Sequence, residues 1–560
     1  MSLKRLNPFS SFSDRAQIWL LIWVMINLIQ SIFTEVNNDE AYYHLYGTNP
    51  DWGYFDHPPM VGWLTALSDF LFDGNLGVRF FNSILQAFTL TYAWKIIQRF
   101  TNTHEQQSHL FFLTAAAMTM LSAYGFIVTP DGPLLFFTAF FLYQFFKFDE
   151  KPHWKNIILL SISMAGLVYS KYQGGLVILF TFVSQPRKIL HLKSWLSGIL
   201  ALGLLIPHFN WQWIHGFPSF TYHLVSRSSE FKWSYFWEYL PNQLAVFNPF
   251  VLIGLVFIPW KIVWKDPNQR SLMMLVFGFL CFFWITSFRG HVEPHWTVAA
   301  SVPMLVLMII HANQSQRLQK YLRKFVVPSL LLIVIARLAI VFIPLPARIG
   351  LNGKAPYYQA IHRIAKNHPV LFEGSFQSPS LYSYFTGQES TVLSNLFSRQ
   401  TQFDLWRWEQ DWMNDSVFIA MKREGLSQSF EIDGQKIDGF WAGDWQSAHG
   451  VQIKMVILDN QLKPGDSSIL SISFFNPGKK SIRSDHPNFP VQWNIAMKTG
   501  ADWTFTPIPE LQDFNLGAGA LITRKIKWKV PEKPCSLGIT AISVFGPTYH
   551  GPHLKINPAN

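Results

Sequence analysis

Apolar runs long enough to cross a lipid bilayer constrain this chain more than any other feature. About eleven of them precede residue 346, and crossing roughly 30 Å of hydrocarbon takes about 20 apolar residues in a helix. Inside a bilayer such runs satisfy their backbone polar groups as helices. We therefore predict an α-helical polytopic membrane protein with about eleven transmembrane helices. The predicted spans are residues 16–33, 77–97, 108–127, 133–148, 156–170, 173–185, 194–209, 244–264, 271–288, 296–311 and 325–345.

Composition and charge agree with a membrane protein. Only 14% of the residues are charged, against roughly 25% in soluble domains. The net charge of +11 raises the question of nucleic acid, but Lys and Arg gather in short segments between apolar runs, which is typical of cytoplasmic loops. Because no basic aromatic motif is present, we predict no nucleic-acid partner. The two cysteines predict no disulfide framework.

The distribution of Lys and Arg also predicts an orientation. Alternate connections are rich and poor in these residues, so the amino terminus should be cytoplasmic. The first apolar run has no small-residue cleavage site after it, and we interpret it as an uncleaved signal anchor. An odd number of spans then places the part after residue 346 outside. We expect a multi-pass protein of the cytoplasmic (inner) membrane whose C-terminal region is periplasmic or otherwise extracytoplasmic.

After residue 346 the sequence mixes polar and apolar residues and carries turn signals such as Asp433-Gly434. From Ile522 to Val530, apolar residues alternate with Lys525, Lys527 and Lys529, a pattern that predicts a half-buried strand. We predict three domains: residues 1–346 in the membrane, residues 347–445 as an α/β module with a helix near residues 357–366, and residues 446–560 as a β-sandwich.

Carboxylates concentrate in residues 34–74, here called the first acidic loop, which contains no Lys or Arg. Its acids are Glu35, Asp39, Glu40, Asp51, Asp56, Asp69 and Asp73. These acids can simply solvate an external loop. Alternatively, Asp39 and Glu40 lie just after a span and run into Tyr43, where a carboxylate can act as general base on an acceptor. A second connection, TPDGPLLFF, carries Asp131 as its one charge, either as a polar turn tip or as the partner of Asp39 in a catalytic pair.

Three cations on the same predicted side are candidates for an anionic ligand. They are Arg79, Lys171 and Arg289. Arg and Lys at such positions can stabilise a phosphate leaving group, although they can equally extend to lipid head groups. His291, Glu293 and His295, with His57, are the right residue types for a metal, but Pro294 interrupts a regular helix. The metal stays open, and we expect these residues, with Glu40 and Tyr43, to bind substrate.

Five segments together resemble a known family. NNDEAYYHLYG, DWGYFDHPPMVGW, LGVRFFNS, TPDGPLLFF and YSKYQGG resemble, in that order, the membrane half of bacterial relatives of the protein O-mannosyltransferases and the lipid A aminoarabinose transferase. These enzymes form part of the glycosyltransferase C superfamily. The resemblance covers about residues 15–345, and RQTQFDLW at residues 399–406 is a weaker match to the related enzymes' outer α/β domain.

The resemblance implies an inverting transfer of a sugar from a polyprenyl-phosphate donor to a lipid, glycan or protein acceptor. It makes Asp39 the catalytic acidic residue and Asp131 the second acidic position. Lys171 and Arg289 resemble the family's contacts to the donor phosphate, while His57 stands where some relatives have Lys. The predicted sandwich is an addition to the common pattern. No cofactor is required, although a divalent metal is not excluded.

Two other classes remain open. A lipid flippase or transporter of envelope glycolipids would share the membrane spans, but proton-coupled transporters need acids inside the membrane and the predicted spans contain neither Asp nor Glu. A non-catalytic envelope scaffold would not need carboxylates and cations on one face. We therefore favour a membrane glycosyltransferase.

Overall fold

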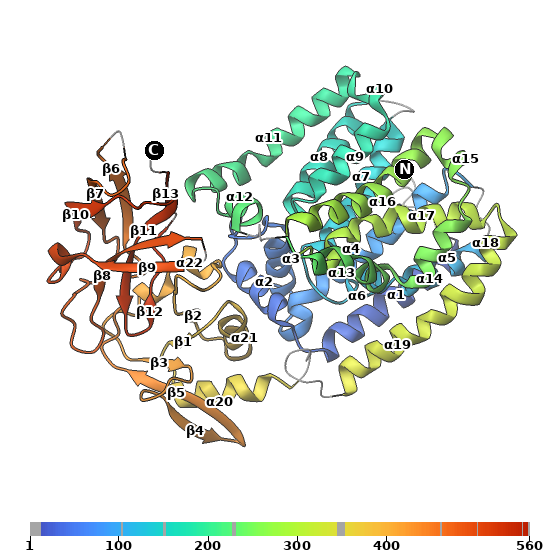
Figure 1. Ribbon diagram of the computed structural model, residues 1–560. Coiled ribbons are helices and arrows are strands. Elements are labelled where there is room, and N and C mark those ends of the chain that lie inside the picture. The colour runs from blue at the N-terminus through green and yellow to red at the C-terminus, as the bar shows by residue number, and fades with distance from the viewer. Residues whose placement is uncertain are drawn as a thin grey trace. The chain divides into compact units, whose positions relative to one another are not determined.

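The computed structural model describes residues 13–101, 105–148, 153–226, 231–343, 353–459, 462–500, 502–551 and 553–557. It divides into two compact units, Met1–Lys354 (unit 1) and Ala355–Asn560 (unit 2). The domain boundary predicted at residues 346 and 347 lies outside the described residues. A mostly helical N-terminal part and a β-rich C-terminal part agree with the sequence-based prediction (Figure 1).

Unit 1 consists of helices joined by short connections (Figure 1). Its first half contains α1 (Asp14–Phe33), α2 (Asn38–Thr48), α3 (Met60–Asp69), α4 (Gly74–Ile97), α5 (Glu105–Ala117), α6 (Thr119–Ala123), α7 (Asp131–Phe148), α8 (Trp154–Ser170), α9 (Gly174–Ser184) and α10 (Pro186–Ile189). Its second half contains α11 (Leu192–Ile214), α12 (Pro218–Thr221), η2 (Tyr222–Ser226), α13 (Trp233–Phe247), α14 (Pro249–Gly254), η3 (Leu255–Phe257), α15 (Trp260–Lys265), α16 (Pro267–Thr286), η4 (Ser287–Arg289), η5 (Pro294–Ala300), α17 (Ser301–Ala312), α18 (Gln316–Tyr321), η6 (Leu322–Val326) and α19 (Val327–Phe342).

Within the described residues, five helical stretches are long and apolar enough to cross a membrane, or six if a bent pair forms one span. They are Arg15–Phe33, Leu192–Ile214, Pro267–Arg289, Pro294–Ala312 and Gln316–Phe342. Shorter apolar helices include α8 and α9. A multi-pass membrane protein is therefore supported, but the expected count of eleven spans is not confirmed.

The predicted span 244–264 is not one helix. Helices α13 and α14 meet at 92° because Asn248 has a left-handed backbone (φ 76°) and the following Pro249 cannot donate a helical hydrogen bond. The Asn248 side chain stabilises the break. It accepts from the Phe250 amide at 3.0 Å and donates to the Ala117 carbonyl at 2.8 Å and to Ser329 at 2.7 Å.

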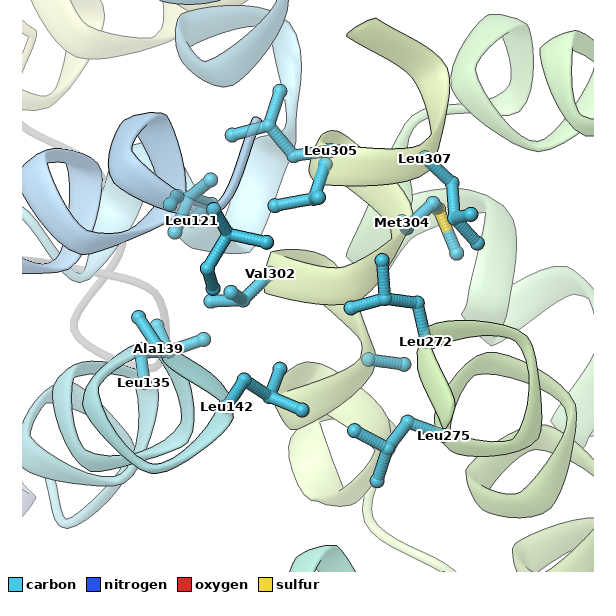
Figure 2. Packing of buried hydrophobic residues seen from close by; sticks show 14 of the residues in the cluster. Leu121, Leu135, Ala139, Leu142, Leu272, Leu275, Val302, Met304, Leu305 and Leu307 are labelled. Carbon is cyan, nitrogen blue, oxygen red and sulfur yellow. The ribbon is translucent and has the colours of Figure 1, made fainter. Parts of the chain in front are cut away.

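The core of unit 1 is built around α17, which is buried along its whole length. Figure 2 shows residues of α7 (Leu135, Ala139 and Leu142) and of α16 (Leu272 and Leu275) on either side of it. A helix that is apolar all round is expected in such a central position. It gives the connections between α6 and α7 and between α16 and α17 a rigid base.

The first acidic loop is structured, which the sequence analysis did not predict. Helix α2 begins with a capping box, in which the Asn37 side chain accepts from the Glu40 amide at 2.9 Å and the Glu40 carboxylate accepts from the Asn37 amide at 3.0 Å. Helices α2 and α3 pack on each other. Gly47 permits this approach, since a Cβ there would lie 2.5 Å from Oγ1 of Thr65.

Unit 2 begins with a five-stranded mixed sheet of strand order β2-β1-β3-β5-β4. Its strands are β1 (Val370–Phe372), β2 (Ser390–Val392), β3 (Val417–Ala420), β4 (Gln428–Ile432) and β5 (Gln435–Ala442), and its helical elements are α20 (Ala355–Ala365), α21 (Gln377–Thr386), α22 (Phe403–Trp406) and η7 (Trp408–Gln410). Asp433 and Gly434 both have positive φ, as a two-residue hairpin turn requires. This turn was predicted from the sequence.

The last part of unit 2 has two antiparallel sheets that share one apolar core. One sheet has the order β10-β7-β6, and the other has the order β12-β11-β8-β9 with β13 paired to β11. The strands are β6 (Gln452–Ile457), β7 (Ser467–Phe475), β8 (Gln492–Thr499), β9 (Asp502–Pro507), β10 (Leu521–Lys529), β11 (Cys535–Ser543), β12 (Gly546–Pro547) and β13 (Leu554–Ile556), with η8 (Pro509–Leu511) between β9 and β10. In β10, Ile526 and Trp528 are buried while the three lysines are exposed, as the alternation predicted.

Candidate active site

A buried ion pair joins two segments that the sequence analysis selected. Asp131 begins α7 and Lys171 follows α8, and the Lys171 Nζ lies 2.7 Å from the Asp131 Oδ1. Only 2% of the Asp131 side chain and 5% of the Lys171 side chain are exposed. The other carboxylate oxygen, Oδ2, lies 3.9 Å from Nε2 of His295. Three predicted site residues therefore meet at one carboxylate.

The position of Asp131 depends on Asn82 of α4. The Asn82 amide donates to the carbonyls of Tyr124 and Ile127 at 2.8 and 3.1 Å, which fixes the connection between α6 and α7. Gly132 leaves the space that Asn82 occupies, because a Cβ at Gly132 would lie 1.9 Å from the Asn82 Oδ1. The sequence analysis quoted Asn82 within a motif but gave it no role.

Asp39 and Asp131 act on the same tyrosine. The Tyr124 hydroxyl is buried within reach of the Asp131 carboxylate, whose charge acts on it, and the charge of Asp39 acts on it more weakly. Asp39 lies in the first turn of α2 and its side chain is exposed. The two carboxylates proposed as a pair thus face a common neighbour, and Tyr124 is a site residue that the sequence analysis missed.

Arg79 and Glu40, both predicted to bind substrate, instead form a completely buried ion pair. The five N–H groups of the Arg79 guanidinium make five hydrogen bonds within the protein. Two go to the Glu40 carboxylate, at 2.6 and 2.5 Å, and three go to the carbonyls of Ser31, Thr34 and Glu35. No N–H group of Arg79 is left for a donor phosphate, so this arrangement gives Arg79 and Glu40 a structural role.

The first acidic loop contains no Lys or Arg, and Lys354, far along the chain, supplies part of the positive charge beside it. Its backbone amide donates to the Glu35 carboxylate at 3.0 Å, and its Nζ donates to Oδ1 of Asn38 at 3.2 Å. Burial lowers the pKa of Lys354, while the carboxylates of Glu35, Glu40 and Asp39 act in the opposite direction. Lys354 is more than 300 residues from these acids in sequence, so no local pattern could reveal it.

Aromatic and histidine side chains line the region next to Lys171. The Tyr43 hydroxyl lies 3.3 Å from Nε2 of His57, and the His57 ring lies 6.5 Å from that of His223. The His223 ring in turn lies 5.8 Å from that of Tyr172, the residue after Lys171. We call these four residues, Tyr43, His57, His223 and Tyr172, the aromatic row. The sequence analysis selected Tyr43 and His57 but not the other two.

A buried carboxylate supports the aromatic row from behind. Asp56 accepts a hydrogen bond from the Tyr46 hydroxyl at 2.7 Å, and its backbone carbonyl lies 2.9 Å from Nε2 of His223. Burial first, and the Asp56 and Tyr42 side chains second, raise the pKa of Tyr46 well above its ordinary value. Tyr46 therefore stays protonated and can donate to Asp56, which fixes the backbone beside His57.

The predicted site residues in the segment after α16 make separate contacts and do not form one cluster. Arg289 ends η4 and is exposed. The Nε2 of His291 lies 3.8 Å from the Glu293 carboxylate, while His295 lies at Asp131. Among the residues that the structure describes, no group of three or more His, Cys, Asp or Glu side chains is arranged to hold a metal. The sequence analysis left a metal at these residues open, and the described part of the structure offers no such cluster in support of one.

Comparisons with known proteins show a likeness over the part of the chain that carries much of this geometry. Residues 56–211, which include Arg79, Asp131 and Lys171, match the family model described as dolichyl-phosphate-mannose-protein mannosyltransferase. The fold is that of ArnT from Cupriavidus metallidurans, whose apo structure matches with a TM-score of 0.55 at 12% identity, over 76% of this chain and 98% of that one. Over residues 56–211 the chain is therefore similar to the mannosyltransferases that this family model describes. The resemblance found in the sequence is thus confirmed.

Two further matches show how far the likeness extends. The structure of the same ArnT bound to undecaprenyl phosphate matches with a TM-score of 0.56 at 12% identity, over 76% of this chain and 97% of that one. An uncharacterized protein of Aquifex aeolicus (strain VF5) is 27% identical over 158 residues, which is 26% of this chain. That match spans about a third (31%) of the Aquifex protein's length.

Proposed function

We propose that the protein is an integral membrane glycosyltransferase that takes a sugar from a polyprenyl-phosphate donor. It transfers the sugar with inversion to a lipid, glycan or protein acceptor at the extracytoplasmic (periplasmic) face of the cytoplasmic membrane. The observation that carries the proposal is the buried pair of Asp131 and Lys171, with Tyr124 linking it electrostatically to Asp39. The fold likeness to ArnT, which has been solved with undecaprenyl phosphate bound, supports a lipid-linked donor.

On this geometry we propose different roles for the two carboxylates. Asp131 is buried and paired with the Lys171 ammonium group at 2.7 Å, so we assign to it the positioning of Lys171. Asp39 is exposed and is the better general base. Lys171 has three N–H groups and one of them donates to Asp131, so the others can bind the donor phosphate.

In the proposed step, the acceptor oxygen or nitrogen attacks the anomeric carbon and Asp39 receives its proton. The bond between that carbon and the phosphate oxygen breaks, and its electron pair stays on the departing polyprenyl phosphate. Lys171 and Arg289 stabilise the charge that develops there, because fixed cations in a partly dry site act strongly on a leaving group. Attack from the face opposite the phosphate gives the inverted product.

An apolar groove offers a place for the polyprenyl chain. It has a volume of about 510 Å³ and lies between α13, α14 and α16, with Leu240, Leu252, Leu280 and Trp284 among its lining residues. Helix α16 runs from this groove directly into η4, which ends at Arg289. A chain in the groove would therefore approach Arg289 with its phosphate. A nucleotide-sugar donor has no apolar chain that could fill this groove.

The aromatic row gives the sugar a binding surface. Aromatic rings pack against the C–H faces of a sugar ring while phenol and imidazole groups bond to its hydroxyls. Tyr172 is adjacent to Lys171 in the chain and in ring contact with His223, so this surface begins beside the proposed phosphate site. We expect substitutions in the row to change which sugar is accepted.

The test uses purified full-length protein with a panel of radiolabelled undecaprenyl-phosphate hexoses and pentoses and, as acceptors, membranes from cells lacking the gene. We expect Asp39→Asn to lower the transfer rate by a factor of about 10² to 10⁴, the usual contribution of a general base. The matched control is Asp73→Asn, an exposed acid of the same loop whose side chain makes no capping bond. It should leave the rate unchanged. Folded Asp39→Asn protein that transfers at the wild-type rate would disprove the assignment.

A further inference from the structure

A second cationic site lies within the membrane part of unit 1, on α19. Arg337 is in the apolar stretch Gln316–Phe342, five residues or about 7.5 Å before that helix ends. An Arg at this depth is costly unless its charge is compensated. Nη2 of Arg337 donates to Oδ1 of Asn27 at 2.8 Å and to the Ser122 carbonyl at 2.6 Å, and the guanidinium lies over the Phe126 ring at 4.7 Å. These partners are neutral.

The rest of the guanidinium is not used by the protein. Within the part of the chain that the structure describes, no carboxylate pairs with Arg337, and its recorded hydrogen bonds both come from Nη2. Nε and Nη1 carry three further N–H groups. The residue is partly exposed, so these donors face the surroundings of the helix bundle. A positive charge with three remaining donors can still bind single phosphate oxygens.

An apolar cavity begins at the same guanidinium. It has a volume of about 150 Å³ and is lined by α1, α5 and α19, with Ile22, Ile26, Leu330 and Val334 on its walls. Leu330 lies seven residues before Arg337, so the cavity extends about 10 Å along the helix away from the charge. Helix α19 makes few contacts with the rest of the protein, because only 11% of the apolar part of the stretch Gln316–Phe342 is buried. A gap between helices at this depth is filled by acyl chains rather than by water.

We propose that Arg337 and this cavity bind one anionic phospholipid, with its phosphate on Arg337 and part of one acyl chain in the cavity between α1 and α19. The charge of Arg337 favours an anionic lipid over a zwitterionic one, because the head group of the latter has no net charge to compensate it. The site is separate from the groove proposed for the donor chain, which lies between α13, α14 and α16.

The lipid would also support the active-site connection. Arg337 holds the Ser122 carbonyl and lies over Phe126, and these residues flank Tyr124. The Arg337 carbonyl accepts from the Gln30 amide at 3.2 Å, which joins α19 to the end of α1 that leads to α2. A bound phosphate would therefore stabilise the contact between α19 and both segments that carry the acidic residues.

The experiment measures lipid retention by the full-length protein. Wild-type protein and variants are reconstituted in nanodiscs of phosphatidylglycerol and phosphatidylethanolamine at equal amounts, transferred to detergent, and analysed by native mass spectrometry. We expect wild type to retain one phosphatidylglycerol. Arg337→Gln should weaken that retention roughly tenfold or more. The matched control is Lys324→Gln, an exposed cation nearer the other end of the same helical stretch, and it should retain the lipid as wild type does.

A second variant tests the cavity without altering the charge. Ile26→Trp places a large side chain in the cavity and should also reduce retention about tenfold while Arg337 remains. The proposal is overturned if wild type retains both lipids in proportion to their supply, or if Arg337→Gln retains as much phosphatidylglycerol as wild type. It is equally overturned if added undecaprenyl phosphate displaces the lipid from wild type, since the cavity would then belong to the donor.

Discussion

Replacing Arg79 by Met should destabilise the membrane unit rather than weaken donor binding. The guanidinium and the Glu40 carboxylate are both completely buried and share two hydrogen bonds. Removing Arg79 leaves the Glu40 charge without its partner and leaves the carbonyls of Ser31, Thr34 and Glu35 without their donors. Breaking a buried pair in this way typically costs about 3–5 kcal/mol.

The expected loss of unfolding free energy reflects the number of buried groups left unpaired. A cost of about 3–5 kcal/mol raises the unfolding equilibrium constant by about 10² to 10⁴. Part of this loss should return in the double variant Arg79→Met with Glu40→Gln, because no buried charge then remains. We expect the double variant to lose less unfolding free energy than the two single variants lose together. The difference should be about 1 kcal/mol or more.

Equilibrium unfolding in mixed micelles of dodecyl sulfate and dodecyl maltoside, followed by tryptophan fluorescence, measures these free energies. The control is Lys95→Met on the same helix, α4, whose ammonium group lies 5.2 Å from the centre of the Tyr92 ring. This half-exposed cation should cost under about 1 kcal/mol. The apparent KM for the donor, measured on the folded fraction, should be unchanged in Arg79→Met. If stability is unchanged while KM rises tenfold, Arg79 binds the donor phosphate and its structural assignment is refuted.

Two further outcomes are expected. Gly132→Ala should lower the rate of sugar transfer at least tenfold, because the new methyl group would lie 1.9 Å from Oδ1 of Asn82 and displace Asp131. The activity control is Gly175→Ala, because a Cβ at Gly175 meets nothing within 4 Å. In unit 2, burial opposes protonation of His449, but Glu409 and Asp404 outweigh it and raise its pKa to about 9. Because the folded-state pKa is the higher one, this stabilisation is complete below about pH 6.5 and is lost as the pH rises through about 9. The protection factors of the amides of residues 447–451, in which exchange rates are corrected for the intrinsic effect of pH, should therefore fall over that range in wild type, and in His449→Gln they should be low throughout.

The sequence predicted the residues whose position follows directly from an apolar run. Asp131 and Lys171 each stand at the end of a helix that hydrophobicity alone identifies, and the structure brings them to 2.7 Å. Alternation in β10 and the Asp433-Gly434 turn were predictable for the same reason, since each depends on neighbours a few residues away.

What the sequence did not predict depends on contacts between distant segments. Arg79 and Lys171 look alike in sequence, as lone cations beside a span. Only the fold shows that Glu40 and three backbone carbonyls use every N–H group of Arg79. The Lys171 ammonium group, among the described residues, donates one hydrogen bond, to Asp131. Tyr124 and Lys354 carry no local signal for a role beside acidic residues. Helix α2 is a different case, because the capping box of Asn37 and Glu40 was present in the sequence and could have been used.

One buried carboxylate determines where both acidic residues of the site lie. Glu40 closes the capping box of α2, so its neighbour Asp39, about 100° further round the helix, is directed to the exposed side. The same Glu40 accepts the backbone amide of Val128 at 2.8 Å, three residues before Asp131. The pair of Glu40 and Arg79 therefore couples the two segments that carry Asp39 and Asp131, which gives a fully buried ion pair a purpose beside the proposed active site.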